Sequence, residues 1–237
     1  MKSNMKKFLS FLGAAVICAS CVFPTDGLKG IKVNNGKTIT CNGPVVTRTL
    51  DFSGFDAITV NGSSDMEILQ GDVFQVLVKA NEEVFDHIAY KVEDAVLIIE
   101  NKDSVNIKAE EYDVTVTLPI LKALTVNGAA DVEMEKGYVS SEDLVMEVNG
   151  AGDFSLSGIK VPSLSVELNG AGDIEANGLD VKDLSVEVNG AGDIDVSGKA
   201  VNANFSVSGV ADIDARELVT ENVKTSKEGL GRIRLKR

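Results

Sequence analysis

A segment of about 20 residues recurs along the second half of the chain, and a sequence repeat of this kind restricts the fold more than any other feature. Its copies begin with LTVNGAADV at Leu124, MEVNGAGDF at Met146, VELNGAGDI at Val166, VEVNGAGDI at Val186 and FSVSGVADI at Phe205. The aspartates of these copies stand at positions 131, 153, 173, 193 and 212, and a diverged copy, ITVNGSSDM, begins at Ile58. A nearly constant period of this length indicates one structural unit per copy, stacked on its neighbours.

Apolar and polar residues alternate on both sides of the N-G-A-G-D segment. In the copy around Val186, apolar residues stand at 184, 186 and 188 before this segment and at 194 and 196 after it. A period of two is typical of strands with one buried face, so each copy is predicted to be strand, turn, strand. No helical period separates the copies. The sequence therefore predicts an all-β fold, a β-solenoid with about 20 residues per coil over residues 124–237.

An asparagine and a glycine recur at the same place in each predicted turn. Stacking would place the asparagines in one column, where their amides can exchange hydrogen bonds along the stack. The glycine position requires either a positive φ or a close approach of backbone. We assign a structural role, rather than ligand binding, to this turn ladder. Its members are Asn127, Asn149, Asn169 and Asn189, and Gly128, Gly150, Gly170 and Gly190.

The same stacking would place one carboxylate per copy in a column, formed by Asp131, Asp153, Asp173, Asp193 and Asp212. Carboxylates about 5 Å apart repel each other by about 1 kcal/mol in water. Two hypotheses account for such a column. Each aspartate accepts local backbone N–H groups in an Asx-type turn while solvent screens the rest, or the column binds Ca²⁺. We favour the first and predict no cofactor, because the period is not that of the calcium-binding nonapeptide repeats. Arg232 stands where the next aspartate is expected and would cap the column.

The N-terminus has the pattern of an export signal. Residues 1–7 are basic and residues 8–20, FLSFLGAAVICAS, are apolar or small. This apolar stretch is too short to span a bilayer. Small residues directly before Cys21 resemble the lipobox of bacterial lipoproteins, which predicts a signal peptide over 1–20, a lipidated Cys21 and a tether over 21–44. The protein is then expected in the cell envelope, anchored to the outer membrane and facing either the surface or the periplasm.

Residues 45–123 are predicted to form a β-rich region that covers the first coil. Strands are expected over 57–60, 66–69, 74–78, 96–100 and 114–118, with a short helix within 81–90. The ordered series of DFSGF at 51–55, ITV at 58–60, QGD at 70–72, VTLPIL at 116–121 and the N-G-A-G-D repeats resembles the head GIN domain family of adhesin-like exported proteins, which is frequent in the Bacteroidetes. The resemblance covers roughly residues 45–235. It implies a right-handed β-helix, a place outside the cytoplasm and a role in adhesion.

These observations favour a non-enzymatic envelope lipoprotein that binds glycans or proteins. A periplasmic scaffold or envelope-stress accessory protein is the alternative, and a polysaccharide-active β-helix enzyme is a third. The enzyme is disfavoured because the chain has no Trp to stack on sugars, a single His and no nucleophile motif. The net charge of −13 argues against nucleic acid as a partner. The sequence selects no oligomeric state and no particular ligand.

Overall fold

The computed structural model describes residues 37–102, 105–134 and 137–236. The predicted signal peptide, Cys21 and the first part of the predicted tether lie outside these residues. All the elements belong to the unit Gly36–Arg237. In chain order they are β1 (Thr38–Cys41), β2 (Val45–Leu50), β3 (Ala57–Gln70), β4 (Gln75–Asn81), α1 (Val84–His87), β5 (Ile88–Glu93), β6 (Val96–Asn101), β7 (Asn106–Ala109), β8 (Tyr112–Leu118), β9 (Ala123–Met134), β10 (Tyr138–Val139), β11 (Leu144–Ala151), β12 (Phe154–Ser157), β13 (Ile159–Ala171), β14 (Ile174–Gly229) and β15 (Arg232–Leu235).

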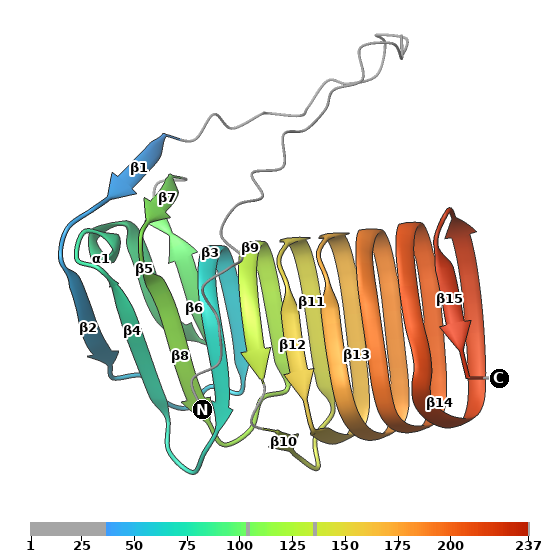
Figure 1. Cartoon of the computed structure of the whole chain (residues 1–237). Helices are drawn as coiled ribbons and strands as arrows, with labels where there is room; N and C mark the ends of the chain where they lie inside the picture. The colour runs from blue at the N-terminus through green and yellow to red at the C-terminus, as the bar shows by residue number, and fades with distance from the viewer. Residues whose placement is uncertain (1–36, 103–104, 135–136, 237) are drawn as a thin grey trace, which may run out of the picture. The chain divides into compact units, whose positions relative to one another are not determined.

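The fold is nearly all β, as the alternation of the sequence predicts. One large sheet of 13 strands contains every strand except β1 and β7, which pair with each other in parallel. From β9 to β15 the copies follow one another along the sheet in the order of the sequence (Figure 1), and each strand pairs with its equivalent in the neighbouring copy, as β11 does with β9 and β13. Extended, paired backbone runs without a break through several turns in β14, which covers residues 174–229.

Parallel pairing brings equivalent positions of successive copies into register. Asn149 of β11 lies opposite Asn127 of β9 on one side and opposite Asn169 of β13 on the other. Asp212 of β14 pairs with Arg232 of β15, its equivalent in the next copy. The strand register therefore follows the repeat period, so each copy places the same side chains on its neighbours.

The core consists of columns of apolar side chains from these strands. Before the turn, one column is Leu124, Met146, Val166, Val186 and Phe205; after the turn, another is Val132, Phe154, Ile174, Ile194 and Ile213; all are buried. Burying a side chain of this kind stabilises the fold by about 1.5–3 kcal/mol relative to exposure. The residues between them point outward, which leaves the alternate polar positions of every copy in rows on the surface.

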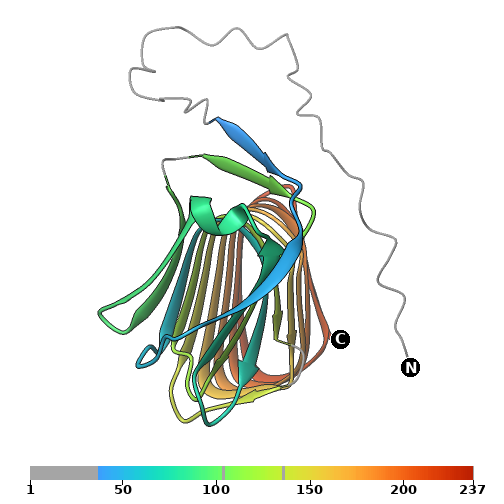
Figure 2. The same cartoon turned by 90° about the vertical axis from the view of Figure 1, so that its left-hand side faces the viewer.

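The first half of the chain closes this stack with antiparallel strands. β3 is one strand and pairs in parallel with β9 from Ala57–Ala123 to Glu67–Glu133, so the diverged copy at Ile58 stacks directly on the first clear copy. Beyond β3, β8 is parallel, and β4 and β2 follow as antiparallel strands. Figure 2 shows these strands and α1 nearest the viewer, in front of the later copies.

The helix expected within 81–90 is shorter than the sequence pattern indicates. Only Val84–His87 is helical, and Ile88 begins β5, which pairs antiparallel with β6. Val84 and Ile88 are buried, while Phe85 is half-buried beneath the guanidinium of Arg48, 4.1 Å from its ring centroid. Ile88, Tyr90 and Val92 stand at alternate positions, as in a strand. In β5 the backbone of this segment forms its hydrogen bonds with β6, where one more helical turn would form them within the segment.

Candidate functional site

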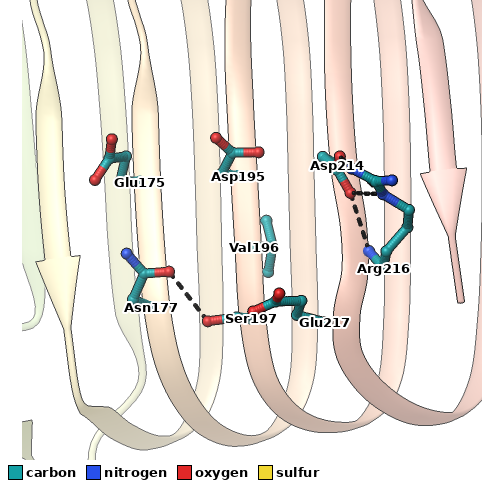
Figure 3. A pocket seen from close by; sticks show the side chains of 8 residues that line it. All are labelled: Glu175, Asn177, Asp195, Val196, Ser197, Asp214, Arg216 and Glu217. Carbon is teal, nitrogen blue, oxygen red and sulfur yellow. Dashed lines mark hydrogen bonds and ion pairs between the residues drawn. The ribbon is translucent and has the colours of Figure 1, made fainter.

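An open hollow of about 550 Å³ lies against β14, on the outer side of the strand that follows each turn. Its lining residues are Glu175, Asn177, Asp195, Val196, Ser197, Asp214, Arg216 and Glu217 (Figure 3). These residues come from three successive copies. The copy-to-copy register places Glu175, Asp195 and Asp214 in one row, which ends in Arg234 of β15. The hollow is thus a polar patch that the repeat itself produces.

The charges in the hollow are unevenly compensated. The Arg216 Nε lies 2.9 and 3.0 Å from the two carboxylate oxygens of Asp214, and the backbone N–H of Arg216 donates to the same carboxylate at 3.2 Å. These hydrogen bonds hold the pKa of Asp214 at about 2. Glu175, Asp195 and Glu217 form no ion pair within 4.0 Å among the described residues, although, after the hydrogen bond and charge of Asp214, the charges of Asp195 and Glu217 help to raise the pKa of Arg216. Their carboxylates are therefore available to an incoming donor.

The remaining polar groups are already engaged in the row beside these carboxylates. Ser197 Oγ donates to Asn177 Oδ1 at 3.1 Å and accepts from the Gly178 N–H at 3.1 Å. An amide oxygen does not act as a general base, so Ser197 is not activated as a nucleophile. The arrangement offers hydrogen-bond acceptors and one guanidinium to a ligand. This site was not predicted from the sequence, because the predicted site residues were all turn residues. The signal for it was the acidic residue that recurs two positions after the turn aspartate.

The structure brings the predicted asparagines together as a continuous ladder. Asn127 Nδ2 donates to Asn61 Oδ1 at 2.8 Å, and each later asparagine donates to the one before it, at 3.0, 3.0 and 2.9 Å for Asn149, Asn169 and Asn189. The second N–H of each of the last three reaches a glutamate two residues earlier, at 2.8–3.1 Å. The ladder thus donates a hydrogen bond to each of these glutamates, Glu147, Glu167 and Glu187, and leaves few free amide groups for a ligand.

The predicted turn glycines lie where backbones of adjacent copies approach closely. A Cβ on Gly150 would lie 1.9 Å from the carbonyl oxygen of Gly128, and one on Gly170 or Gly190 would lie 1.9 Å from the carbonyl oxygen of the preceding glycine. Such distances are far inside van der Waals contact. Close approach of the neighbouring backbone explains the glycine at all these positions, because a left-handed φ occurs at only some of them.

The aspartates of the turn also form a column, but their hydrogen-bond partners are not local. Asp131 Oδ1 accepts the backbone N–H of Asp153 at 3.0 Å, and the same contact links Asp153 to Asp173 and Asp173 to Asp193 at 3.1 and 2.9 Å. The expected local Asx-type turn is wrong in this respect, because each N–H comes from the next copy. These bonds offset part of the repulsion between carboxylates.

The column ends as the sequence indicates, on an arginine. Arg232 donates its backbone N–H to Asp212 Oδ1 at 3.0 Å, and its guanidinium lies 2.8 Å from the same carboxylate. Arg234 adds a second contact at 3.3 Å. Among the residues that the structure describes, no group of three or more His, Cys, Asp or Glu side chains is placed to hold a metal ion.

Comparison with known proteins agrees with the architecture. The family model "Putative auto-transporter adhesin, head GIN domain" matches residues 54–236. The chain belongs to this family. The head GIN domain thus covers the strands from β3 onward and the hollow, and the family description places such proteins outside the cell or in its envelope. No curated protein sequence matches the chain.

Solved structures share the fold of this head GIN domain at low sequence identity. A putative adhesin from Bacteroides fragilis aligns with a TM-score of 0.67 and 18% identity, over 83% of this chain and 99% of the other. A putative adhesin from Parabacteroides distasonis gives 0.67 and 18% over 84% of each chain. A structure from the same species described as a putative lipid binding protein gives 0.59 and 22%, over 84% of this chain and 99% of that one. Within the described ranges, no helix is long and apolar enough to cross a membrane.

Proposed function

We propose that the head GIN domain is a right-handed β-solenoid of about 20 residues per coil that serves as a non-enzymatic binding module of the cell envelope. The coil length is supported by the register, because parallel partners from β11 to β15 are equivalent positions of successive copies, as in Asn149–Asn169 and Asp212–Arg232. A repeat of this kind presents the same polar side chains at every strand spacing, about 4.8 Å. An extended ligand can contact several copies at once.

The hollow over β14 is the observation that carries the binding function. Three carboxylates that form no ion pair within the described residues, Glu175, Asp195 and Glu217, lie beside the Arg216–Asp214 pair. Such a surface accepts hydrogen bonds from the hydroxyls of a glycan or from the basic side chains of a protein, the two ligand classes we propose. A catalytic role is disfavoured because the only hydroxyl in the lining, that of Ser197, faces an amide.

Binding can be tested with labelled neutral polysaccharides and with immobilised fibronectin and collagen as probes. Replacing Glu175 by Gln and Asp195 by Asn keeps the shape of the hollow and removes both charges. Hydrogen bonds to charged groups contribute about 1.5–3 kcal/mol, so this double variant should weaken binding at least tenfold. The matched control, Asp72→Asn with Glu110→Gln, changes the net charge equally outside the hollow and should stay within twofold of wild type. Equal loss in both variants would contradict the proposal.

The anchor and the side of the membrane form a second part of the proposal. We propose that Cys21 carries lipid and that the domain faces the cell exterior. Protease treatment of intact cells should then release the domain from the membrane fraction, and washing membranes with high salt should remove a Cys21→Ser variant but not the lipid-anchored wild type. Protection until the outer membrane is breached would favour the alternative, a periplasmic scaffold or envelope-stress accessory protein.

We propose further that the domain uses no cofactor, because a backbone N–H already occupies one carboxylate oxygen of Asp131, Asp153 and Asp173. Thermal unfolding midpoints measured in millimolar calcium and in chelator should therefore agree within a degree. A ligand that binds only the folded state raises the midpoint, so a clear rise with calcium would instead establish the calcium alternative for the aspartate column.

A further inference from the structure

The residue at the tip of the turn changes character towards the C-terminal end of the stack. In the regular copies this position is Ala129, Ala151, Ala171 and Ala191, and these alanines lie in register. In the last two copies it is Val210 and then Leu230, which are 61% and 83% exposed. The backbone N–H of Leu230 donates to Gly209 at 2.9 Å, so the two tips are adjacent. Solubility alone would favour a polar residue at such a position.

Basic side chains flank this apolar tip. Lys227 Nζ lies 2.9 Å from the carbonyl oxygen of Gly231, and the Arg232 side chain is 69% exposed. This local pattern is part of a segregation of charge along the chain. Residues 216–237 hold seven basic and three acidic residues, whereas residues 37–215 hold 11 basic and 32 acidic residues. Asp212 and Asp214 cancel part of this charge, because Arg216, Arg232 and Arg234 pair with them. The C-terminal segment still keeps a net positive charge in a molecule that is otherwise strongly negative.

The strands at this end leave apolar side chains uncovered. β15 pairs with β14 on one side only. Val219 and Val223 are 55% and 42% exposed, and with Leu235 and Lys236 they line a hollow of about 280 Å³. Lys224 directly follows Val223. Apolar side chains with basic neighbours thus occur both at the tip and along the final part of β14.

We propose that the C-terminal end of the stack docks on an anionic lipid surface, with Val210 and Leu230 entering the interfacial region and the lysines facing headgroups. Binding to such a surface grows with the apolar area buried and with attraction between basic side chains and anionic lipids, and this end supplies both. Two copies meeting through these ends would bring like charges together, which disfavours that arrangement. The proposal does not depend on the ligand of the β14 hollow.

The test measures partition of the unit 36–237 onto vesicles of pure phosphatidylcholine and of phosphatidylcholine with 30 mol% phosphatidylglycerol. This unit contains the whole described core, Cys41 to Leu218, and its thermal unfolding curve checks that it folds. Wild type should bind the anionic vesicles at least tenfold more strongly. Lys224→Gln with Lys236→Gln should weaken that binding about 25-fold, about fivefold for each lysine, and Leu230→Ser should weaken it at least fivefold.

Matched controls are available away from this end. Lys182→Gln with Lys199→Gln removes two exposed lysines elsewhere on β14, and Val73→Ser replaces a 68% exposed apolar residue of the β3–β4 turn. Both should bind as wild type does. Equal binding to the two vesicle types, or to neither, would overturn the proposal. So would a wild-type dimer in sedimentation that Leu230→Ser converts to a monomer, because the end would then be an interface between copies.

Discussion

Asn169 shows how much a single residue contributes in a stacked fold. It donates to Asn149 at 3.0 Å and to Glu167 at 2.8 Å, and it accepts from Asn189 at 2.9 Å. Replacing it by Ala removes all three contacts and leaves its neighbours without partners. We expect a loss of about 2–3 kcal/mol in the free energy of unfolding, measured in urea. Asn222→Ala is the control. Among the described residues, the Asn222 side chain makes a single hydrogen bond, to Asn202, so this substitution should lower the free energy of unfolding by about 1 kcal/mol or less.

Asp113 makes the stability of the domain depend on pH. Burial, followed by the hydrogen bond with Glu111, raises its pKa to about 6, while Lys79 lowers the pKa of Glu111. A carboxyl with a raised folded-state pKa favours folding when it is protonated. This contribution is present below its ordinary pKa and is lost as the pH rises from about 4 to about 6.

Asp113→Asn should therefore flatten the pH dependence of the unfolding free energy between pH 4 and pH 6. Urea titrations at pH 4.5 and pH 7 on both proteins measure the difference. Asp143→Asn changes an exposed aspartate and should keep the wild-type profile. A wild-type slope retained in Asp113→Asn would show that another group is responsible.

At the scale of elements, the sequence predicts the regular copies well and the first half less well. The alternation around each N-G-A-G-D segment predicts strands with one buried face, and the copies predict the same contacts with their neighbours because their sequences are nearly identical. The segment 81–90 contains Val84, Phe85 and Ile88 at helical spacing, yet β6 recruits Ile88 into a strand. Pairing with this later strand decides the case, and local periodicity does not contain that information.

The hollow over β14 shows a similar limit. Alternation predicts that Glu175 and Asp195 face outward, but only the register places them in one row with Asp214. The partner of each turn aspartate was equally hidden, because the donating N–H belongs to the next copy. The repeat period sets the register, and alternation sets which face each side chain takes, but neither says which backbone N–H of the neighbouring copy a turn carboxylate accepts.

The last strand, β15, offers a test of how the stack ends. Arg232 pairs with Asp212 through both its backbone and its guanidinium. Arg232→Asp would replace this pair by two facing carboxylates, so the unfolding midpoint should fall by about 3–6 °C. Lys236→Asp reverses a charge at the same end without a described ion pair and should change the midpoint by less than about 2 °C. A midpoint unchanged in Arg232→Asp would mean that the cap does not stabilise the end.

At the scale of the whole molecule, the stack combines a closed end with an open one. At the first end, β6 and β8 pair in parallel with β3, and the antiparallel strands β5, β4 and β2 continue from them. At the other end the sheet stops at the edge strand β15, and Val219, Val223 and Leu230 of the last copy are exposed. Repeat proteins need a terminal unit that differs from the internal ones, because an internal face left open exposes apolar side chains to water. Basic residues at the open end discourage pairing with another edge. They also give that end a charge opposite to the rest of the molecule.

The match between repeat period and register also predicts that a whole copy can be removed. Deleting residues 167–186 joins Val166 to Glu187, and the new junction has the same sequence as the wild-type one, Val186–Glu187. Every remaining strand keeps a neighbour in register, so the shortened domain should fold with the same circular dichroism per residue. Its urea m-value should fall roughly in proportion to the surface removed, because m follows the area exposed on unfolding. Deleting only residues 167–176 moves strand segments onto turn positions, and we expect that protein not to fold. If both deletions unfold the domain, the coils are not interchangeable units, and the solenoid would have to be abandoned in favour of a sheet that forms as one indivisible whole.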